Sequence, residues 1–289
     1  MSARSGFLMC ALGIALMCAM DAMAKALGSQ LTTFQIVFLR YTGAALWLVV
    51  WIGLSRGRWP RRSDGLLHLQ RAVLLFITAS LFFYAVAHLP LAVVAALGMT
   101  APVYVTLFGR VIFKDRLGPG GLGALALGAV GSIIIVLGAG TGGPAGASGN
   151  LMGWLAALLA PLTYAVTVIV LKHHSKDDEP AAMTLGQSAI AALIALPFAL
   201  GAWPVPDFGL VGLSVLLGLF GAAGFLLLTH SLQRLPVSVF AVLDYTALIW
   251  AAVLGLALFG EVPELAFWLG APLIICACIL NASKGRHAH

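Results

Sequence analysis

Long apolar segments recur along the whole chain and are separated by short, turn-like polar stretches. Each is about as long as the ~20 apolar residues that an α-helix needs to cross roughly 30 Å of hydrocarbon. Strands of a membrane barrel are not indicated, because they alternate apolar and polar residues over about ten positions. The pattern predicts an all-α fold of ten transmembrane helices, at residues 6–27, 32–54, 67–87, 90–113, 118–138, 151–172, 181–201, 208–232, 236–259 and 263–282.

The break near the middle of the chain is GAGTGGPAGASGN at residues 138–150. Small residues of this kind are typical of a flexible linker. We therefore expect two halves, 1–138 and 151–289, joined by a linker at 139–150. Each half contains five of the predicted helices.

The composition excludes a soluble fold. Hydrophobic residues make up 61% of the chain and charged residues 9%, whereas soluble domains carry about 25% charged residues. The first apolar segment is longer than the core of a signal peptide and contains Asp21 and Lys25, so we interpret it as an uncleaved first helix. The net charge of +6 is not gathered in a basic aromatic patch, so nucleic acid is not an expected partner.

The placement of the basic residues predicts the orientation. Of the 16 lysines and arginines, all except Lys25 and Arg40 fall on one side of the membrane when the N-terminus is placed inside. Basic residues concentrate on the cytoplasmic side of membrane proteins. We expect both termini in the cytoplasm and a multi-pass protein of the plasma membrane, which in a bacterium is the inner membrane.

One stretch of the chain occurs twice. Residues 88–117 align with 234–263 at nine identical positions, among them Pro90, and Asp115 meets Glu261. A repeat offset of about half the chain indicates duplication of one unit. Because each unit holds an odd number of helices, the two copies would cross the membrane in opposite directions. Inverted repeats are the construction of many secondary transporters, with the substrate site near the midplane.

Several features carry a family resemblance, namely Lys25 and Lys172, the segment VFLRYTGAAL, the junctions FFYAVAHLPLA and SLQRLPVSVFA, and the acids Asp115 and Glu261. With the five-plus-five layout, the chain resembles the drug/metabolite transporter superfamily of the EamA type, and within it the YddG-type amino-acid exporters. The resemblance implies a central cavity lined by the first, third, fourth, sixth, eighth and ninth helices. It also implies that the fifth and tenth helices stand apart as supports.

Charged residues within membrane helices are candidates for function, because burying them costs roughly 2.5–3.5 kcal/mol each on insertion scales. Asp21 and Lys25 lie four residues apart on one helix face, and Arg40 on the second helix is able to reach Asp21. These three residues would form a gating charge network or a proton-exchanging carboxylate. The alternative is a structural ion pair near the outer leaflet, with Lys25 reaching the interface.

Asp244 is a second candidate, because the repeat aligns it with Gly98. The second half therefore has a carboxylate at the position where the first half has no side chain. A site that binds an amino group or a proton would need such a carboxylate. The alternative is a carboxylate near the cytoplasmic end, paired with Arg234.

Aromatic and hydrogen-bonding residues on the helices predicted around the cavity complete the proposed substrate contacts. A cavity walled by such groups suits an amphiphilic metabolite with an apolar side chain. For any single aromatic residue taken alone, ordinary packing or a membrane-interface belt is the better explanation. With Asp244, the predicted substrate-binding residues are Tyr84, Tyr104, Tyr164, His230 and Tyr245.

Helix-breaking and small residues point to mobile and closely packed positions. Pro102 and Pro161 lie inside predicted helices, where they would act as gating kinks or as static kinks that shape the packing. Gly218, Gly221 and Gly224 in the eighth helix would provide a small face for close packing against a neighbour.

The sequence predicts a secondary transporter that exports amino acids or similar small metabolites by alternating access. No P-loop is present, so no ATPase of that type is built into the chain. No cofactor is expected, and His173 and His174 with the nearby acids are interpreted as a solvated loop, not a metal site. A transporter of drugs or organic cations is the main alternative; a membrane enzyme or a scaffold is a distant one. We expect a monomer, with a dimer as the alternative.

Overall fold

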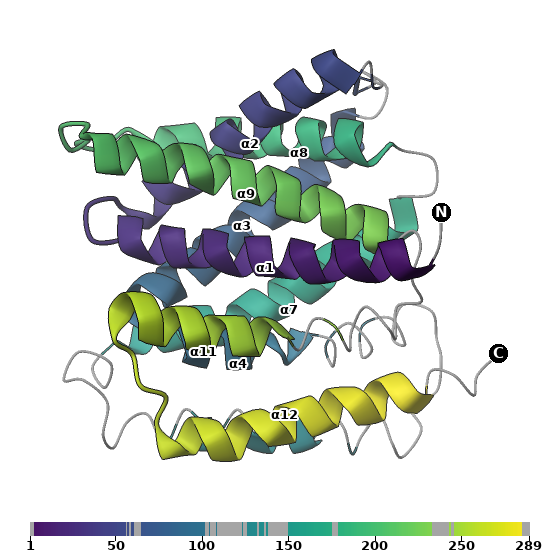
Figure 1. Ribbon diagram of the computed structural model, residues 1–289, viewed down its shortest axis with the longest axis vertical. Helices are drawn as coiled ribbons and strands as arrows, with labels where there is room; N and C mark the ends of the chain where they lie inside the picture. Colours follow the sequence, from purple (N-terminus) through teal and green to yellow (C-terminus); the bar gives the residue numbers. More distant parts are fainter. Residues whose placement is uncertain are drawn as a thin grey trace.

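The protein folds as a bundle of α-helices, and no strand occurs in the described ranges. Lipid offers no hydrogen bonds to the backbone, so an apolar segment pairs its own N–H and C=O groups by forming a helix. A computed structural model describes residues 3–55, 57, 59, 60, 65–101, 104, 108, 123, 126–131, 133–135, 137, 150–174, 179–232, 243 and 246–284. Its helices (Figure 1) are α1 (Ala3–Leu27), α2 (Thr33–Ser55), α3 (Gly65–His88), α4 (Leu91–Gly98), α7 (Leu151–His174), α8 (Pro180–Ala199), α9 (Phe208–Leu232), α11 (Thr246–Phe259) and α12 (Leu265–Lys284).

Five of these helices are long and apolar enough to cross a membrane, namely α1, α2, α3, α8 and α9. Shorter apolar segments belong to α7, α11, α12 and residues 126–135. The later part of the predicted fourth helix, several stretches of the predicted fifth helix and most of the first part of the ninth lie outside the described residues. The chain is therefore an all-helical membrane protein, and the number of ten helices stays a prediction.

Local polar contacts explain where several helices begin. At α2, the Gln35 side chain accepts from Thr32 N (2.9 Å) and the Thr32 hydroxyl accepts from Gln35 N (3.4 Å), which is a reciprocal capping box. Asn150 Oδ1 accepts from Gly153 N at the start of α7 (2.9 Å), and Asp207 caps α9 in the same way. These caps satisfy backbone donors that a helix start leaves unpaired.

The ends of several helices meet at one end of the bundle, called here the Lys25 end. Lys25 near the end of α1 donates to the carbonyls of Val86, in the last turn of α3, and of Leu89, just after it. Gly153 at the start of α7 packs against His88 at the end of α3. α1 and α7, the first helices of the two halves, therefore run in opposite directions. α1 begins and α12 ends at the other end of the bundle (Figure 1).

Glycines bring α9 close to α1 and α2, as the sequence predicts. A Cβ atom on Gly218 would lie 2.6 Å from Gly43 Cα on α2. A Cβ on Gly224 would lie 3.2 Å from Gly13 O on α1, and one on Gly221 would meet Met20 Sδ at 3.1 Å. Small residues allow helix backbones to approach in a membrane, so these positions join the two halves tightly.

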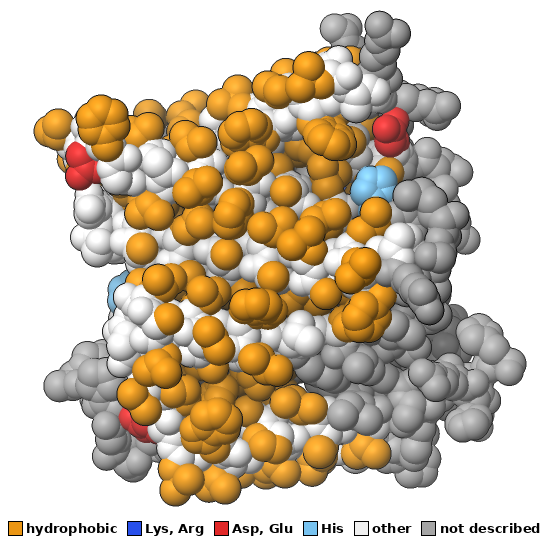
Figure 2. Space-filling view, in the orientation of Figure 1, with side chains coloured by type: hydrophobic (Ala, Val, Ile, Leu, Met, Phe, Trp, Pro, Cys, Tyr) orange, Lys and Arg blue, Asp and Glu red, His pale blue; other side chains and the backbone are white. Residues whose placement is uncertain are grey.

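Apolar side chains cover the visible face over α1, α9, α11 and α12, and the acidic and histidine side chains seen there lie near helix ends (Figure 2). Such a face suits contact with lipid tails. α12 lies at one edge of the bundle (Figure 1). It packs on the predicted fifth helix, since a Cβ on Gly270 would lie 2.6 Å from Gly131 O.

Candidate functional site

The first polar cluster centres on Lys25 at the Lys25 end. Its Nζ lies 2.7 Å from Glu261 Oε1 and donates to the carbonyls of Val86 (3.0 Å) and Leu89 (2.6 Å). A lysine ammonium has three N–H donors, and these contacts provide a partner for each. Lys25 therefore ties the end of α1 to the end of α3 and to the second half of the chain.

Glu261 uses both of its carboxylate oxygens. While Oε1 pairs with Lys25, Oε2 accepts from Leu91 N at 2.9 Å. Leu91 begins α4, whose preceding residue, Pro90, supplies no side-chain cap. A carboxylate at a helix start satisfies an unpaired N–H and interacts favourably with the helix dipole. Glu261, which follows α11 in the second half, thus caps α4 of the first half.

Asp21 is separate from this pair. The structure describes Asp21, Lys25 and Arg40, and it records no ion pair of Asp21 with either cation; Lys25 pairs with Glu261 instead. Arg40 nevertheless lies near enough to Asp21 to interact with it electrostatically. The predicted three-residue network is therefore arranged as two clusters, one around Lys25 and one around Arg40.

The second cluster centres on Arg40 of α2. Its Nη1 donates to Tyr41 Oη (3.1 Å), and that hydroxyl in turn donates to Leu75 O on α3 (3.0 Å). The guanidinium carbon lies 4.8 Å from the centre of the Tyr41 ring and 5.4 Å from that of Phe83. Cation–π contacts at these distances are attractive, so two rings and one hydrogen bond orient the Arg40 head group.

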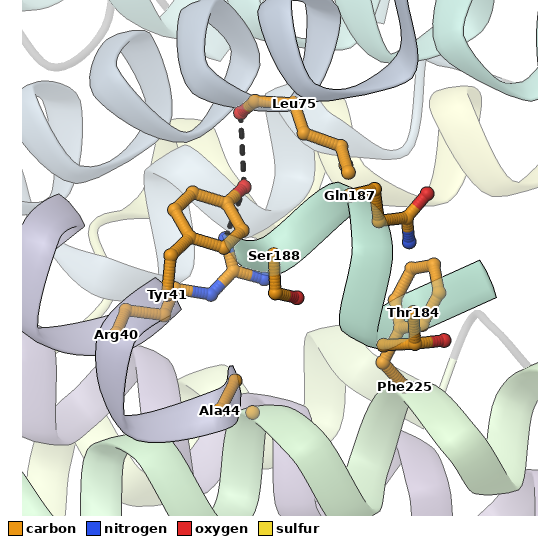
Figure 3. A pocket seen from close by; sticks show the side chains of 9 residues that line it. Arg40, Tyr41, Ala44, Leu75, Thr184, Gln187, Ser188 and Phe225 are labelled. Atoms are coloured by element: carbon orange, nitrogen blue, oxygen red, sulfur yellow. Dashed lines mark hydrogen bonds between the residues drawn. The ribbon is translucent and has the colours of Figure 1, made fainter. Parts of the chain in front are cut away.

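Arg40 and Tyr41 line a pocket between the two halves (Figure 3). α2 and α3 contribute one wall, and α8 and α9 contribute the other. Figure 3 shows the Arg40 guanidinium lying toward Ser188 of α8. The lining residues are Arg40, Tyr41, Ala44, Leu75, Thr184, Gln187, Ser188, Gly221 and Phe225.

Three polar residues within one turn of α8, at positions 184, 187 and 188, line this pocket. Thr184 is satisfied by its own helix, because its hydroxyl donates to Pro180 O at 2.7 Å. Gln187 is 2% exposed and Ser188 is 3% exposed. Within the described part of the chain, neither of their side chains has a hydrogen-bond partner, although buried polar groups ordinarily have one.

A further contact joins the halves between the clusters. Thr78 Oγ1 of α3 donates to Thr163 Oγ1 of α7 at 3.0 Å, and the Thr163 hydroxyl donates to Ala160 O. Pro161, a predicted gating position, is buried inside α7 beside this contact. α7 continues through Pro161 to His174.

The predicted substrate-contacting residues are dispersed. Tyr84 is half-buried and stacks on His88 with ring centres 4.2 Å apart. Tyr104 and His230 are half-buried, and Tyr164 is 41% exposed. None of these residues lines the Arg40 pocket. Of the other predicted residues, Asp244, Tyr245 and Pro102 lie outside the described residues.

Sequence reasoning missed several residues of the two clusters. Glu261 was recognised as the repeat partner of Asp115 but not as the partner of Lys25. Gln187 and Ser188 stand out only as two adjacent polar residues in an otherwise apolar helix. Polar side chains inside a membrane helix usually face a cavity or a neighbouring helix. The polarity of Gln187 and Ser188 is therefore the sequence signal that indicates their place in the pocket.

Comparison with known proteins agrees with this architecture. The sequence pattern of the EamA-like transporter family matches twice, at residues 4–137 and 151–283. The chain is 26% identical over 282 residues to the pseudopaline exporter CntI of Pseudomonas aeruginosa, covering 96% of this chain and 95% of that protein.

Two other relatives and a solved structure extend the comparison. A riboflavin transporter of Brucella anthropi is 26% identical, covering 84% of this chain and 86% of its own. An S-adenosylmethionine uptake transporter of Rickettsia bellii is 22% identical, covering 90% and 87%. A protein of known crystal structure has the same fold, with a TM-score of 0.67, 22% identity and 99% coverage of both chains. The named relatives are transporters and not enzymes. Because the family pattern matches both halves of the sequence, this chain belongs to the EamA-like transporter family.

Proposed function

We propose that this membrane transporter of small metabolites exports amino acids, chiefly those with apolar or aromatic side chains, or closely similar compounds. The two five-helix halves would alternate between access to the two sides of the membrane. The observation that carries the proposal is the ion pair between Lys25 and Glu261, which joins the halves at one end of the bundle.

The ion pair acts as an outer gate in this proposal. The basic residues of the loops favour an orientation in which the Lys25 end lies at the outer side of the membrane. Rocking of the halves would separate Lys25 of α1 from Glu261, which follows α11, and break the 2.7 Å contact. Because the Lys25 and Glu261 side chains are only 12% and 21% exposed, opening would hydrate both ions, which offsets part of the lost attraction.

The amino-acid specificity rests on the chemistry of the helices. An amphiphilic substrate needs apolar or aromatic walls with a few polar groups, and Tyr84, Tyr164, His230 and Asp244 are proposed to supply them. The named relatives carry chemically different metabolites, so they support the transporter class and leave the substrate to be tested. We further propose a monomer in a bacterial inner membrane.

Transport into proteoliposomes tests the proposal. The purified chain would be tested with phenylalanine, leucine and valine, and with riboflavin, S-adenosylmethionine and tetraalkylammonium ions, with and without a pH gradient. Protein-free liposomes are the control. We expect saturable movement of at least one amino acid that competes with the others. Movement of quaternary amines alone, or of no compound, would overturn the amino-acid assignment.

A further inference from the structure

We propose that the Arg40 pocket is the subsite that binds the carboxylate group of the substrate. This inference rests on the proposed function, since it assigns one chemical group of an amino-acid-like substrate to a defined place. The pocket lies between α2 and α3 of the first half and α8 and α9 of the second half. It is distinct from the Lys25–Glu261 pair and from the aromatic residues discussed above.

The first argument is a positive charge that has no carboxylate at ion-pair distance in the described residues. Arginine stays protonated in proteins and carries five N–H donors in a planar fork. One donor is used by Tyr41 Oη. Among the residues that the structure describes, no carboxylate lies within 4.0 Å of the Arg40 guanidinium. Arg40 is half-buried, and a cation partly removed from water gains from a close counterion, so an incoming anion would supply both charge and hydrogen-bond acceptors.

The second argument is that the guanidinium is held in place before a ligand arrives. The Tyr41 and Phe83 rings contact it, and the Tyr41 hydroxyl is itself anchored to Leu75 O. Guanidinium groups bind carboxylates through two parallel hydrogen bonds, which demand a fixed orientation. An oriented fork loses less conformational freedom when it binds a carboxylate.

The third argument comes from the opposite wall. Gln187 and Ser188 are buried, line the same pocket and have no hydrogen-bond partner in the described ranges. An amide NH₂ and a hydroxyl are donors that suit carboxylate oxygens. Because both side chains border the pocket, their donors are available to a ligand that enters it. A bound carboxylate would pair them and bridge the two halves at once, from Arg40 of α2 to Gln187 and Ser188 of α8.

This bridging position gives the pocket a role in transport. A carboxylate held by both halves favours the arrangement in which the walls stay close. Asp21 interacts with Arg40 electrostatically, so it is the chain's own competitor for the guanidinium. When a substrate carboxylate binds Arg40, the attraction between Asp21 and Arg40 weakens.

Ligand-dependent thermal stability of the purified full chain in detergent tests the assignment. The probes are phenylalanine, 3-phenylpropionate, which lacks the amino group, and phenylalaninamide and phenethylamine, which lack the carboxylate. We expect both carboxylates to stabilise the protein, with affinities at least about tenfold above those of the two compounds without one. Sodium chloride at matched ionic strength is the anion control.

Variants on both walls connect the effect to the pocket. Arg40→Gln should abolish the preference for carboxylates, and Arg40→Lys should retain part of it, because lysine keeps the charge and loses the fork. Gln187→Leu should weaken 3-phenylpropionate binding several-fold without touching the Arg40 contacts. Gln35→Leu is the matched control, since Gln35 is equally buried and binds Ala202 O outside the pocket.

Equal binding of phenylalanine and phenylalaninamide would overturn the inference, as would protection by chloride equal to that by carboxylates. Unchanged carboxylate preference in both Arg40→Gln and Gln187→Leu would also overturn it. The proposed function can fail separately. If 3-phenylpropionate binds in an Arg40-dependent way while no amino acid moves in proteoliposomes, the subsite stands and amino-acid export does not. If amino acids move equally well in wild type and Arg40→Gln, export stands and the subsite does not.

Discussion

Lys25 and Glu261 lie 236 positions apart in the sequence, and their side chains meet at 2.7 Å. Every donor of the ammonium has a partner, because Lys25 also donates to Val86 O of α3 and to Leu89 O just after that helix. Both carboxylate oxygens are occupied as well, since Oε2 accepts from the first N–H of α4. The pair is therefore a junction of four chain segments. An ion pair of this kind depends on its hydrogen bonds as much as on its charges.

The junction predicts different costs for two substitutions of Glu261. Glu261→Gln removes the charge but keeps an oxygen able to accept from Leu91 N, whereas Glu261→Ala removes both. We expect Glu261→Gln to lower the free energy of unfolding by roughly 1.5 kcal/mol and Glu261→Ala to lower it more. Thermal unfolding in detergent measures both, and transport in proteoliposomes should fall in the same order.

The matched control for this prediction is Glu264→Gln, which removes a carboxylate three residues away that has no ion pair in the described structure. We expect it to be nearly neutral. Equal stability of Glu261→Gln, Glu261→Ala and wild type would show that the junction contributes nothing.

The crossing of α2 and α9 predicts a steric effect at Gly218. A Cβ there would lie 2.6 Å from Gly43 Cα, which is backbone and has no room to move. We expect Gly218→Ala to destabilise the protein by about 1–3 kcal/mol, measured by thermal unfolding. Gly212→Ala on the same helix is the control, because no atom lies within 4 Å of its added Cβ. Similar behaviour of the two variants would contradict the close approach.

The contact between Thr78 and Thr163 predicts a small coupling between α3 and α7. A double-mutant cycle with Thr78→Val and Thr163→Val isolates the 3.0 Å hydrogen bond. We expect a coupling energy of about 0.6 kcal/mol, typical of hydrogen bonds between membrane helices. A coupling of zero would show that the two hydroxyls act independently.

Asp21 and Asp244 are the two candidates for the proton-carrying group in proton-coupled transport. Asp21 is half-buried in α1, and Asp244 lies outside the described residues. Amidation of the proton-carrying acid should remove the response of transport to a pH gradient while leaving exchange of substrate for substrate. We expect one of Asp21→Asn and Asp244→Asn to behave so. An unchanged response in both variants would remove these residues from proton coupling.

Much of the fold could be predicted from segments of the sequence. The apolar runs located α1, α2, α3, α8 and α9, because the length and composition of a run decide whether it crosses a membrane. The glycines of α9 predicted close packing, because a helix face without side chains lets any neighbouring helix approach its backbone. The partner helices, α1 and α2, were not predictable, because a small face fits many surfaces.

The site was predictable in part. Lys25, Asp21 and Arg40 stood out because charges inside membrane helices are rare. The sequence by itself determined an apolar, internally duplicated chain with few buried charges, since hydropathy and repetition are properties of contiguous residues. Only the tertiary structure decided that Lys25 meets Glu261 instead of Asp21, and that Arg40 shares a pocket with Gln187 and Ser188. The physical reason is that these contacts depend on how helices from the two halves pack, and each polar group takes the partner that packing brings within hydrogen-bonding distance.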